Sequence, residues 1–416
     1  MVTMSQTIDI DAGLIEKYIM ELAKFGEHSG TGVWRTVYSP EWVAATQQYA
    51  RWCEDAGLTV HHDTVGNVWG RLKGREPGPS IVSGSHIDTQ RPGGRYDGTL
   101  GALAGLIAIR ALKTQFGIPR RTLEAVALCE EEGSRFPSAG WWGSRGITGR
   151  IAPGDSDKLV SLDGTETMTD AMRAVGLDPD DVAAARRNDI DSFVELHIEQ
   201  GPILEQVDLP VAIVSGITGI RHYDVELIGQ QNHAGGFPMD MRRDPMAGFA
   251  EIANSLVDTA HRWGRPAVTT VGRVEVEPNS VAVVPKRVRF TVDARHPVQE
   301  SYERLMASHE RLMREVAARR NLEISWKVMI DQPACPSDPG LYAVAQEAAR
   351  DQGVPFMTMA SGAGHDSQQM AAIAKVVMIF VRSKDGRSHT PEEFSSIKDI
   401  VAGIRVLAAT LHKLAY

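Results

Sequence analysis

Hydrophobic spacing divides the chain into a helix-and-strand region and a differently patterned insertion. Apolar residues recur every three or four positions in IEKYIMELAKFG and in EWVAATQQYARWCEDAGL, which predicts two helices near the start. Short β-branched runs bounded by glycine predict strands, the clearest over Ser80–Asp88 and Thr122–Leu128. A helix is expected from about Thr99, and a polar helical stretch over 150–188. Strands alternating with helices are typical of an α/β fold.

The pattern changes after the strand that carries ELHIEQG. Four runs that alternate between apolar and polar residues predict strands: HYDVELIG, VTTVGRVEV, KRVRFTVDAR and LEISWKVMI. Helices are expected over 244–263 and 299–320. The order βαββαβ is that of a ferredoxin-like sandwich. We therefore expect an inserted domain over 215–331, and a discontinuous first domain formed by 1–214 and 332–416. The last segment resumes the α/β pattern.

Composition narrows the class of protein. The 416 residues include 43% hydrophobic and 23% charged residues, which is ordinary for a globular enzyme. A net charge of -9 without basic runs argues against a nucleic-acid or anionic-membrane partner. Three distant cysteines predict no disulfide framework, the start lacks the pattern of a signal peptide, and no apolar run approaches the roughly 20 residues of a membrane span. We expect a cytoplasmic protein.

Candidate chemistry gathers at the predicted strand ends and loops of the first domain. The His, Asp and Glu residues at these places are His86, Asp88, Asp97, Glu131, Glu132, His197, Glu199 and His389. A nitrogen and oxygen set without cysteine suits zinc, manganese, cobalt or nickel. Two divalent ions about 3.5 to 4 Å apart need a bridging carboxylate, and Asp97 in its glycine-flanked loop is the best candidate. The sequence predicts a two-metal centre.

A hydrolytic centre also needs a base that takes a proton from water and returns it to the leaving nitrogen. Of two adjacent carboxylates, one can bind metal while the other stays free, and we assign Glu131 as the base beside the ligand Glu132. Asp88 follows His86 by two residues and is expected to hold its imidazole in the ligating tautomer. An isolated His-x-Asp pair such as His86 and Asp88, or an isolated run of three glutamates such as 130–132, is more often a solvated loop or a capping cluster. Their joint occurrence favours a site.

Several motifs together resemble one family of enzymes. These motifs are GSHIDT, GGRYDGTLGALAG, EEEGSRF, ELHIEQGPILE, NHAGGFPM, PNSVAVVP, VDARHP, SGAGHDS and RSKDGRSHTPEE. From about residue 13 to its end, the chain resembles the hydantoinase/carbamoylase amidases, which are dinuclear metallohydrolases with an aminopeptidase-like catalytic domain. The resemblance implies cleavage of the C–N bond of linear amides. It also implies five metal ligands, with Asp97 bridging and Glu131 as the base: His86, Asp97, Glu132, His197 and His389.

The resemblance further assigns the inserted domain as a lid and dimerisation domain. His233 would reach the active site of the partner subunit in a homodimer and stabilise the oxyanion. Asn279 and Arg295 would hold the substrate carboxylate. Gln200 would lie beside the substrate, and the loop from Gly362 to His365 would line the pocket. Two alternatives stay open, because Arg295 could belong to a surface ion pair and Gln200 could be a strand-end cap.

Departures from the family pattern lie near the expected pocket. Gly236 and Phe237 stand where relatives more often carry two threonines, PNSVAVVP replaces PNAxNVIP, and the pair Trp141 and Trp142 is not typical. We interpret them as signs of an unusual, more apolar or aromatic substrate side chain. The leading hypothesis is an N-carbamoyl-L-amino acid or ureido-acid hydrolase. The alternatives are an allantoate amidohydrolase, a peptidase or N-acyl amino acid hydrolase, and a non-catalytic binding protein, against which the complete ligand set argues.

Overall fold

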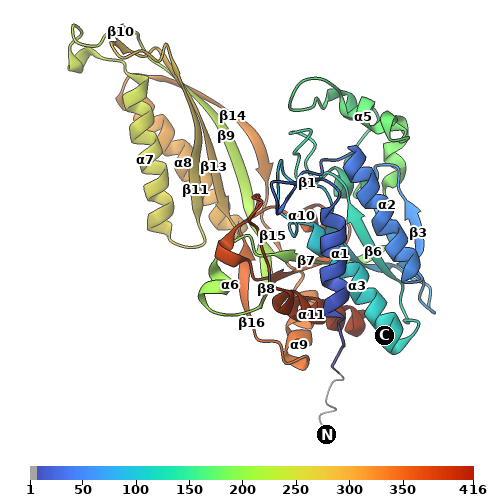
Figure 1. Ribbon diagram of the computed structural model, residues 1–416. Coiled ribbons are helices and arrows are strands. Elements are labelled where there is room, and N and C mark those ends of the chain that lie inside the picture. Colours follow the sequence, from blue (N-terminus) through green and yellow to red (C-terminus); the bar gives the residue numbers. More distant parts are fainter. Residues whose placement is uncertain (1–6) are drawn as a thin grey trace. The chain divides into compact units, whose positions relative to one another are not determined.

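A computed structural model describes residues 7–416 and divides the chain into two units (Figure 1). Unit 1 comprises the chain up to Ser215 together with Ser337–Met359 and His365–Tyr416, and unit 2 comprises Gly216–Pro336 and Ala360–Gly364. The insertion thus extends a few residues beyond the expected 215–331 and includes a short later segment. The expectation that the start of the chain has no signal-peptide pattern concerns a segment of which residues 1–6 lie outside the described residues.

A mixed sheet forms the centre of unit 1. In spatial order its main strands are β3 (Thr59–His62), β4 (Val68–Leu72), β6 (Leu123–Leu128), β5 (Ser80–His86), β7 (Ile190–Ile198), β17 (Lys375–Val381) and β8 (Val211–Ile217), and β16 (Phe356–Ser361) pairs with β8. The two-residue β15 (Cys335–Pro336), which belongs to unit 2, pairs with the last two residues of β8. β6, β5, β7 and β17 run parallel to one another, and the flanking pairs are antiparallel. The carboxyl ends of the parallel strands therefore meet at one edge.

Helices cover the sheet of unit 1. The longer helices are α1 (Ala12–Ala23), α2 (Pro40–Asp55), α3 (Thr99–Phe116), α9 (Pro339–Asp351) and α11 (Ile397–Ala415). α3 packs on β5, β6 and β7, and α11 packs on α3 and β17, whereas the short α4 (Trp142–Ile147) and α10 (Asp366–Met370) contact each other. Side-chain caps begin several helices: Ser39 accepts a hydrogen bond from Trp42 N, and Asp338 accepts one from Leu341 N.

Glycines let α3 approach the sheet closely. A Cβ on Gly101 would lie 2.2 Å from the carbonyl oxygen of Leu196, and one on Gly105 would lie 2.6 Å from that of Ser83. Gly98 has a φ of 60°, and its Cβ would lie 2.1 Å from Nε2 of His86. The sequence DGTLGALAG therefore places the start of the helix directly against the strand ends.

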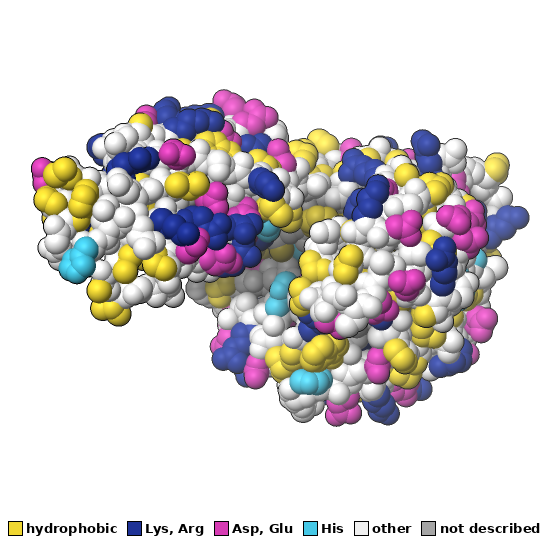
Figure 2. Space-filling view, turned by 90° about the horizontal axis from the view of Figure 1, so that it is seen from above, with side chains coloured by type: hydrophobic (Ala, Val, Ile, Leu, Met, Phe, Trp, Pro, Cys, Tyr) yellow, Lys and Arg dark blue, Asp and Glu magenta, His cyan; other side chains and the backbone are white. Residues whose placement is uncertain are grey.

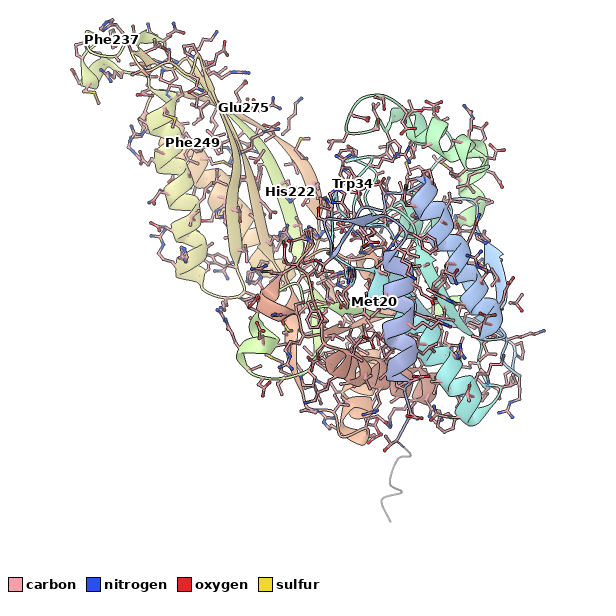
Figure 3. All side chains as sticks on the ribbon, viewed as in Figure 1. Met20, Trp34, His222, Phe237, Phe249 and Glu275 are labelled. Carbon is pink, nitrogen blue, oxygen red and sulfur yellow. The ribbon has the colours of Figure 1, made fainter. Side chains whose placement is uncertain are left out.

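Unit 2 has the predicted βαββαβ order. Its elements are β9 (Gly219–Ile228), α7 (Pro245–Trp263), β11 (Val268–Glu277), β13 (Arg287–His296), α8 (Gln299–Arg319) and β14 (Glu323–Gln332). The antiparallel strand order is β11-β13-β9-β14, with both helices on one face (Figure 1). Phe249 of α7 packs on Phe290, whereas Glu275 and His222 lie on the face away from the helices (Figure 3).

The open sheet face of unit 2 is covered by ion pairs. Arg287 contacts Glu226 at 2.9 Å, and Arg273 contacts Glu275 at 3.5 Å. Basic and acidic side chains accordingly lie next to one another on this unit in Figure 2. A short pairing of β10 (Asn232–His233) with β12 (Val283–Val284) extends the unit to a tip, where Figure 3 places Phe237.

Short elements complete the chain, and two expectations differ from the structure. The remaining elements are β1 (Glu27–His28), β2 (Gly32–Val33), η1 (Ser156–Lys158), α5 (Met168–Ala174), η2 (Pro179–Ala185), α6 (Ile203–Gln206), η3 (Met239–Met241) and η4 (Lys384–Gly386). The expected helical stretch over 150–188 was wrong in extent, because glycines with positive φ at 154, 164 and 176 interrupt it. Strand β8 was not predicted. No helix within 7–416 is both long and apolar enough to cross a membrane.

Candidate metal centre

Parallel strands and the start of α3 bring the predicted ligands together in unit 1. His86 ends β5, His197 lies near the end of the neighbouring β7, and Asp97 lies just before α3. Asp97 Oδ1 lies 3.1 Å from His197 Nε2 and 3.7 Å from His86 Nε2. All three side chains are buried. Their ligand atoms lie within 4.8 Å of one another, so they form one cluster that could hold a cation.

A second cluster shares Asp97. Nε2 of His389 lies 3.2 Å from Asp97 Oδ2 and 3.5 Å from Glu132 Oε1. The three ligand atoms of Asp97, Glu132 and His389 also lie within 4.8 Å of one another. Each of the two Asp97 oxygens therefore faces a different cluster. This arrangement is what a carboxylate that bridges two ions requires.

The charges and unpaired atoms of these clusters fit divalent cations. Glu132 Oε1 is buried without a hydrogen-bond partner. Burial alone would raise the pKa of Asp97, but hydrogen bonds from His197 and His389 hold that pKa well below its usual range. Despite burial, the hydrogen bond to Asp97 raises the pKa of both histidines to about 9. The surroundings of Asp97 thus favour its ionised form, and imidazole and carboxylate ligands suit zinc, manganese, cobalt or nickel.

Glu131 lies beside the first cluster. Its Oε2 lies 3.9 Å from His86 Nε2. Burial, together with the nearby carboxylates of Glu132 and Asp366, raises the pKa of Glu131 well above its usual range. A carboxyl group of raised pKa next to a cation site suits a base that accepts a proton and later donates it.

The side chain of Asp88 differs from its predicted role. His86 Nδ1 contacts the backbone carbonyl oxygen of Asp88 at 2.9 Å, whereas the Asp88 carboxylate lies 3.8 Å from the ring. The carboxylate instead accepts hydrogen bonds from the backbone N–H groups of Glu131 and Glu132, both at 3.2 Å. The backbone carbonyl leaves Nε2 of His86 facing the cluster, and the carboxylate holds the backbone of Glu131 and Glu132.

Two predicted substrate residues contact the clusters directly. Gln200 Nε2 donates to Asp97 Oδ2 at 3.0 Å, and Gln200 has a left-handed backbone with a φ of 56°. The ring of His365 is buried and packs edge-on against His197, with 4.6 Å between ring centroids. His365 therefore packs against a candidate ligand, and its place in the pocket lining stays a prediction.

Sequence reasoning missed several supporting residues. Gln90 Nε2 donates to Glu132 Oε2 at 2.8 Å. Ser388 Oγ donates to Asp97 Oδ2 at 2.7 Å, and Glu393 accepts hydrogen bonds from the loop before α3. Single Gln, Ser and Glu residues in loops carry no periodic signal, so only the fold reveals these contacts.

His233 lies in unit 2, next to the tip. Its Nδ1 accepts hydrogen bonds from the N–H groups of Gly235 at 3.1 Å and Gly236 at 2.8 Å. In a neutral imidazole the other nitrogen then carries the proton. The exposed ring thus presents Nε2–H as a donor. Phe237 is half-buried in the same turn, while Met239 and Met241 are exposed.

The other predicted residues of unit 2 lie on its strands and loops. Arg295 forms a bidentate ion pair with Asp293, at 2.8 and 2.7 Å, and its Nη1 donates to the carbonyl oxygen of Gly362 at 2.7 Å. The alternative of an ion pair for Arg295 is thus present in this structure. Asn279 is exposed and has a φ of 56°.

The paired tryptophans differ from each other. Trp142 is fully buried in the core of unit 1, and its backbone N–H donates to the carbonyl oxygen of Glu130 at 2.9 Å, next to the loop of Glu131. Trp141 is half-buried with a φ of 62°, and its backbone N–H donates to the carbonyl oxygen of Glu131 at 3.1 Å. Trp141 therefore borders the loop that carries the base.

Comparison with known proteins identifies the family. The family described as peptidase family M20/M25/M40 matches residues 57–413. The chain belongs to this family. It is 41% identical over 403 residues to allantoate amidohydrolase of Escherichia coli (strain K12), covering 97% of this chain and 98% of the relative. It is 36% identical over 414 residues to N-carbamoyl-L-amino-acid amidohydrolase of Pseudomonas sp. (strain NS671), covering 98% and 99%.

A solved structure agrees with these relatives. An amidase of the hydantoinase/carbamoylase family from Burkholderia multivorans superposes with a TM-score of 0.90 at 34% identity, covering 98% of both chains. The resemblance predicted from the motifs, the mixed α/β fold and the amidohydrolase class are confirmed.

Proposed function

We propose that this protein is a two-metal amidohydrolase that cleaves the carbamoyl C–N bond of an N-carbamoyl-L-amino acid or a related ureido acid. The products would be the amino acid, carbon dioxide and ammonia. The observation that carries the proposal is the pair of ligand clusters that share Asp97, with the buried Glu131 beside them. The similarity to carbamoyl and allantoate amidohydrolases supports the ureido substrate class.

The residues divide into two ion sites. His86, Asp97 and His197 would hold one ion, and Asp97, Glu132 and His389 would hold the other. When bound, such ions polarise a carbonyl oxygen and lower the pKa of water. The imidazole and carboxylate donors suit zinc, manganese, cobalt or nickel.

Glu131 performs the proton transfers. Its carboxylate takes a proton from the attacking water and gives it to the nitrogen that leaves from the carbamoyl carbon. The raised pKa of Glu131 supports this role, because a weakly acidic carboxyl group holds the proton between the two steps. Asp88 keeps the loop of Glu131 in place through its two backbone hydrogen bonds.

Unit 2 supplies the remaining contacts from a second subunit. In a homodimer, His233 of the partner subunit would donate its Nε2–H to the carbonyl oxygen as negative charge develops there. Asn279 and Arg295 would bind the substrate carboxylate, Arg295 by sharing its guanidinium with Asp293. The unpaired edge strands β11 and β14, with exposed Val268 and Met329, support pairing with a second copy. We also propose a cytoplasmic location, which the free cysteines support.

Allantoate is a second candidate substrate. It is a ureido acid, and the relative named for it is 41% identical to this chain, against 36% for the carbamoyl enzyme. The departures from the family pattern at Trp141, Gly236 and Phe237 instead favour a substrate with an apolar or aromatic side chain, and the backbone of Trp141 contacts the loop of Glu131.

Ammonia release separates these candidates. The protein, reconstituted with manganese, cobalt or zinc, is given N-carbamoyl-L-amino acids with small, aliphatic and aromatic side chains, then allantoate, an N-acetyl amino acid and a dipeptide. Faster turnover of aromatic carbamoyl substrates supports the leading proposal, and preference for allantoate supports the second. Cleavage of only the dipeptide or the acetyl compound, detected as free amine, would contradict both.

A further inference from the structure

Glu393 connects the two loops that carry Asp97 and His389. It lies between η4 and α11, and its side chain is buried. Its Oε1 accepts hydrogen bonds from the backbone N–H groups of Tyr96 at 2.9 Å and Asp97 at 3.0 Å. Its Oε2 lies 3.0 Å from Ser388 Oγ, whose single hydroxyl proton is shared between this oxygen and Asp97 Oδ2. One carboxylate thus contacts the backbone of one ligand and the residue that precedes another.

Close packing around Glu393 shows that the contact is built into both loops. A Cβ on Gly94 would lie 2.1 Å from Glu393 Oε1 and 2.5 Å from its Cβ, so only glycine leaves room for the carboxylate. The adjacent Phe394 packs edge-on against Tyr96, with 5.9 Å between ring centroids. The two loops are therefore joined by polar and aromatic contacts.

His389 needs such support. Its side chain is 51% exposed, and its backbone has a left-handed φ of 57°. Ser388 donates at 2.7 Å to Asp97 Oδ2, the oxygen that also faces His389. The second cluster consequently depends on the loop of His389, whose own side chain is half exposed. In contrast, His86 and His197 are buried at or near the ends of sheet strands.

We propose that Glu393 is a positioning residue that holds the loop of His389 against Asp97, and so sets the affinity of the second cluster (Asp97, Glu132, His389) for its ion. This inference rests on the two-metal centre proposed above. Loss of Glu393 releases the His389 loop and removes two hydrogen bonds from the loop before α3. Asp97 stays held by Gln200 and by the first turn of α3, where Leu100 N donates to the carbonyl oxygen of Tyr96, and the His86 and His197 strands stay in place. The effect should therefore fall on one ion of the two.

Metal titration of four variants tests this assignment. Metal-free full-length wild type, Glu393→Ala, Glu393→Gln and Ser388→Ala are titrated with Mn²⁺ by calorimetry, and bound metal is counted by mass spectrometry. Glu392→Ala is the matched control, because the neighbouring Glu392 is exposed and its carboxylate contacts Thr390. In Glu393→Gln the amide oxygen can accept from both backbone N–H groups, and the amide NH₂ can donate to Ser388.

For Glu393→Ala we expect one ion to bind about 10- to 100-fold more weakly and the other to bind as in wild type. Ser388→Ala should shift the same ion by a smaller factor, while Glu393→Gln and Glu392→Ala should bind both ions as wild type does. Unchanged affinity for both ions in Glu393→Ala, or in Ser388→Ala if the former does not fold, would overturn the proposal. Equal weakening of both ions in Glu393→Gln would also overturn it. Wild type that binds fewer than two ions would instead contradict the two-metal centre.

Discussion

Gly98 offers a direct test of how the fold positions a metal ligand. An alanine Cβ at this position would lie 2.1 Å from His86 Nε2, where ordinary contact begins at 3.4 Å. The strand backbone and the contact of Nδ1 with the carbonyl oxygen of Asp88 hold the ring, so His86 must move by about 1 Å. The positive φ of 60° with a ψ of −51° adds backbone strain on the order of 1–3 kcal/mol for alanine.

Displacement of this size should reduce kcat/KM of Gly98→Ala on the order of 100-fold, since misplacement by 1 Å near reacting groups costs about that much. Gly117 is the matched control. It ends the same helix with a φ of 78°, but a Cβ there would meet nothing within 4 Å. Gly117→Ala should therefore carry backbone strain of its own, without a clash on a candidate ligand, and keep its activity.

The assay measures ammonia release at saturating Mn²⁺, with the unfolding free energy of both variants measured in parallel. Loss of activity in Gly98→Ala alone, at similar stability of the two proteins, supports the account. Full activity in Gly98→Ala would refute the reasoning, because His86 could then not be held at the observed position.

Three further predictions concern the base, the dimer and stability. Glu131→Gln should lower kcat by about 10²- to 10⁴-fold at unchanged metal content, measured by ammonia release and metal analysis; near-normal kcat would remove Glu131 as the base. Mixed Glu131→Gln and His233→Ala subunits should regain roughly a quarter of wild-type activity after subunit exchange, since half the dimers then contain one complete site; no recovery despite exchange would exclude action of His233 across the dimer. Burial lowers the pKa of His309 from 6.5 in the unfolded chain to about 4 in the folded protein. As the pH falls, the unfolded chain therefore binds the proton first, and the stability that neutral His309 contributes above pH 6.5 is lost between pH 6.5 and 4. Between pH 7.5 and 4 this should reduce the unfolding free energy by roughly 3 kcal/mol more in wild type than in His309→Leu, measured by denaturant titration; equal losses would contradict the burial argument.

The sequence could indicate which proposed ligands lie close together, because these residues lie at strand ends within specific motifs. The structure brings His86, Asp97, Glu132, His197 and His389 together as two clusters around Asp97. Contacts that depend on loops meeting in space could not be predicted. Among these are the bonds of the Asp88 carboxylate to the next loop and the bonds of Glu393 to residues almost 300 positions earlier.

Helices and strands could be predicted where the residue pattern is regular, and could not where it is not. Unit 2 was predictable because its strands alternate between buried and charged residues, as in Arg287–His296. The buried run Val211–Ile217 lacks alternation and was missed as a strand. Segment 150–188 contains polar helical spacing, yet glycine turns divide it into short pieces. A tryptophan pair carries no signal that tells which ring is buried, so the full burial of Trp142 beside the half-buried Trp141 could not be predicted.

The central claim is a hydrolytic centre that needs two ions around Asp97. The most direct measurement removes metal with a chelator, returns Mn²⁺ stepwise, and records the rate of ammonia release from an N-carbamoyl-L-amino acid at each step. The account predicts no activity in the metal-free protein and recovery that reaches its maximum at about two ions per subunit. Full activity in the metal-free protein, or a maximum that needs no second ion, would contradict it.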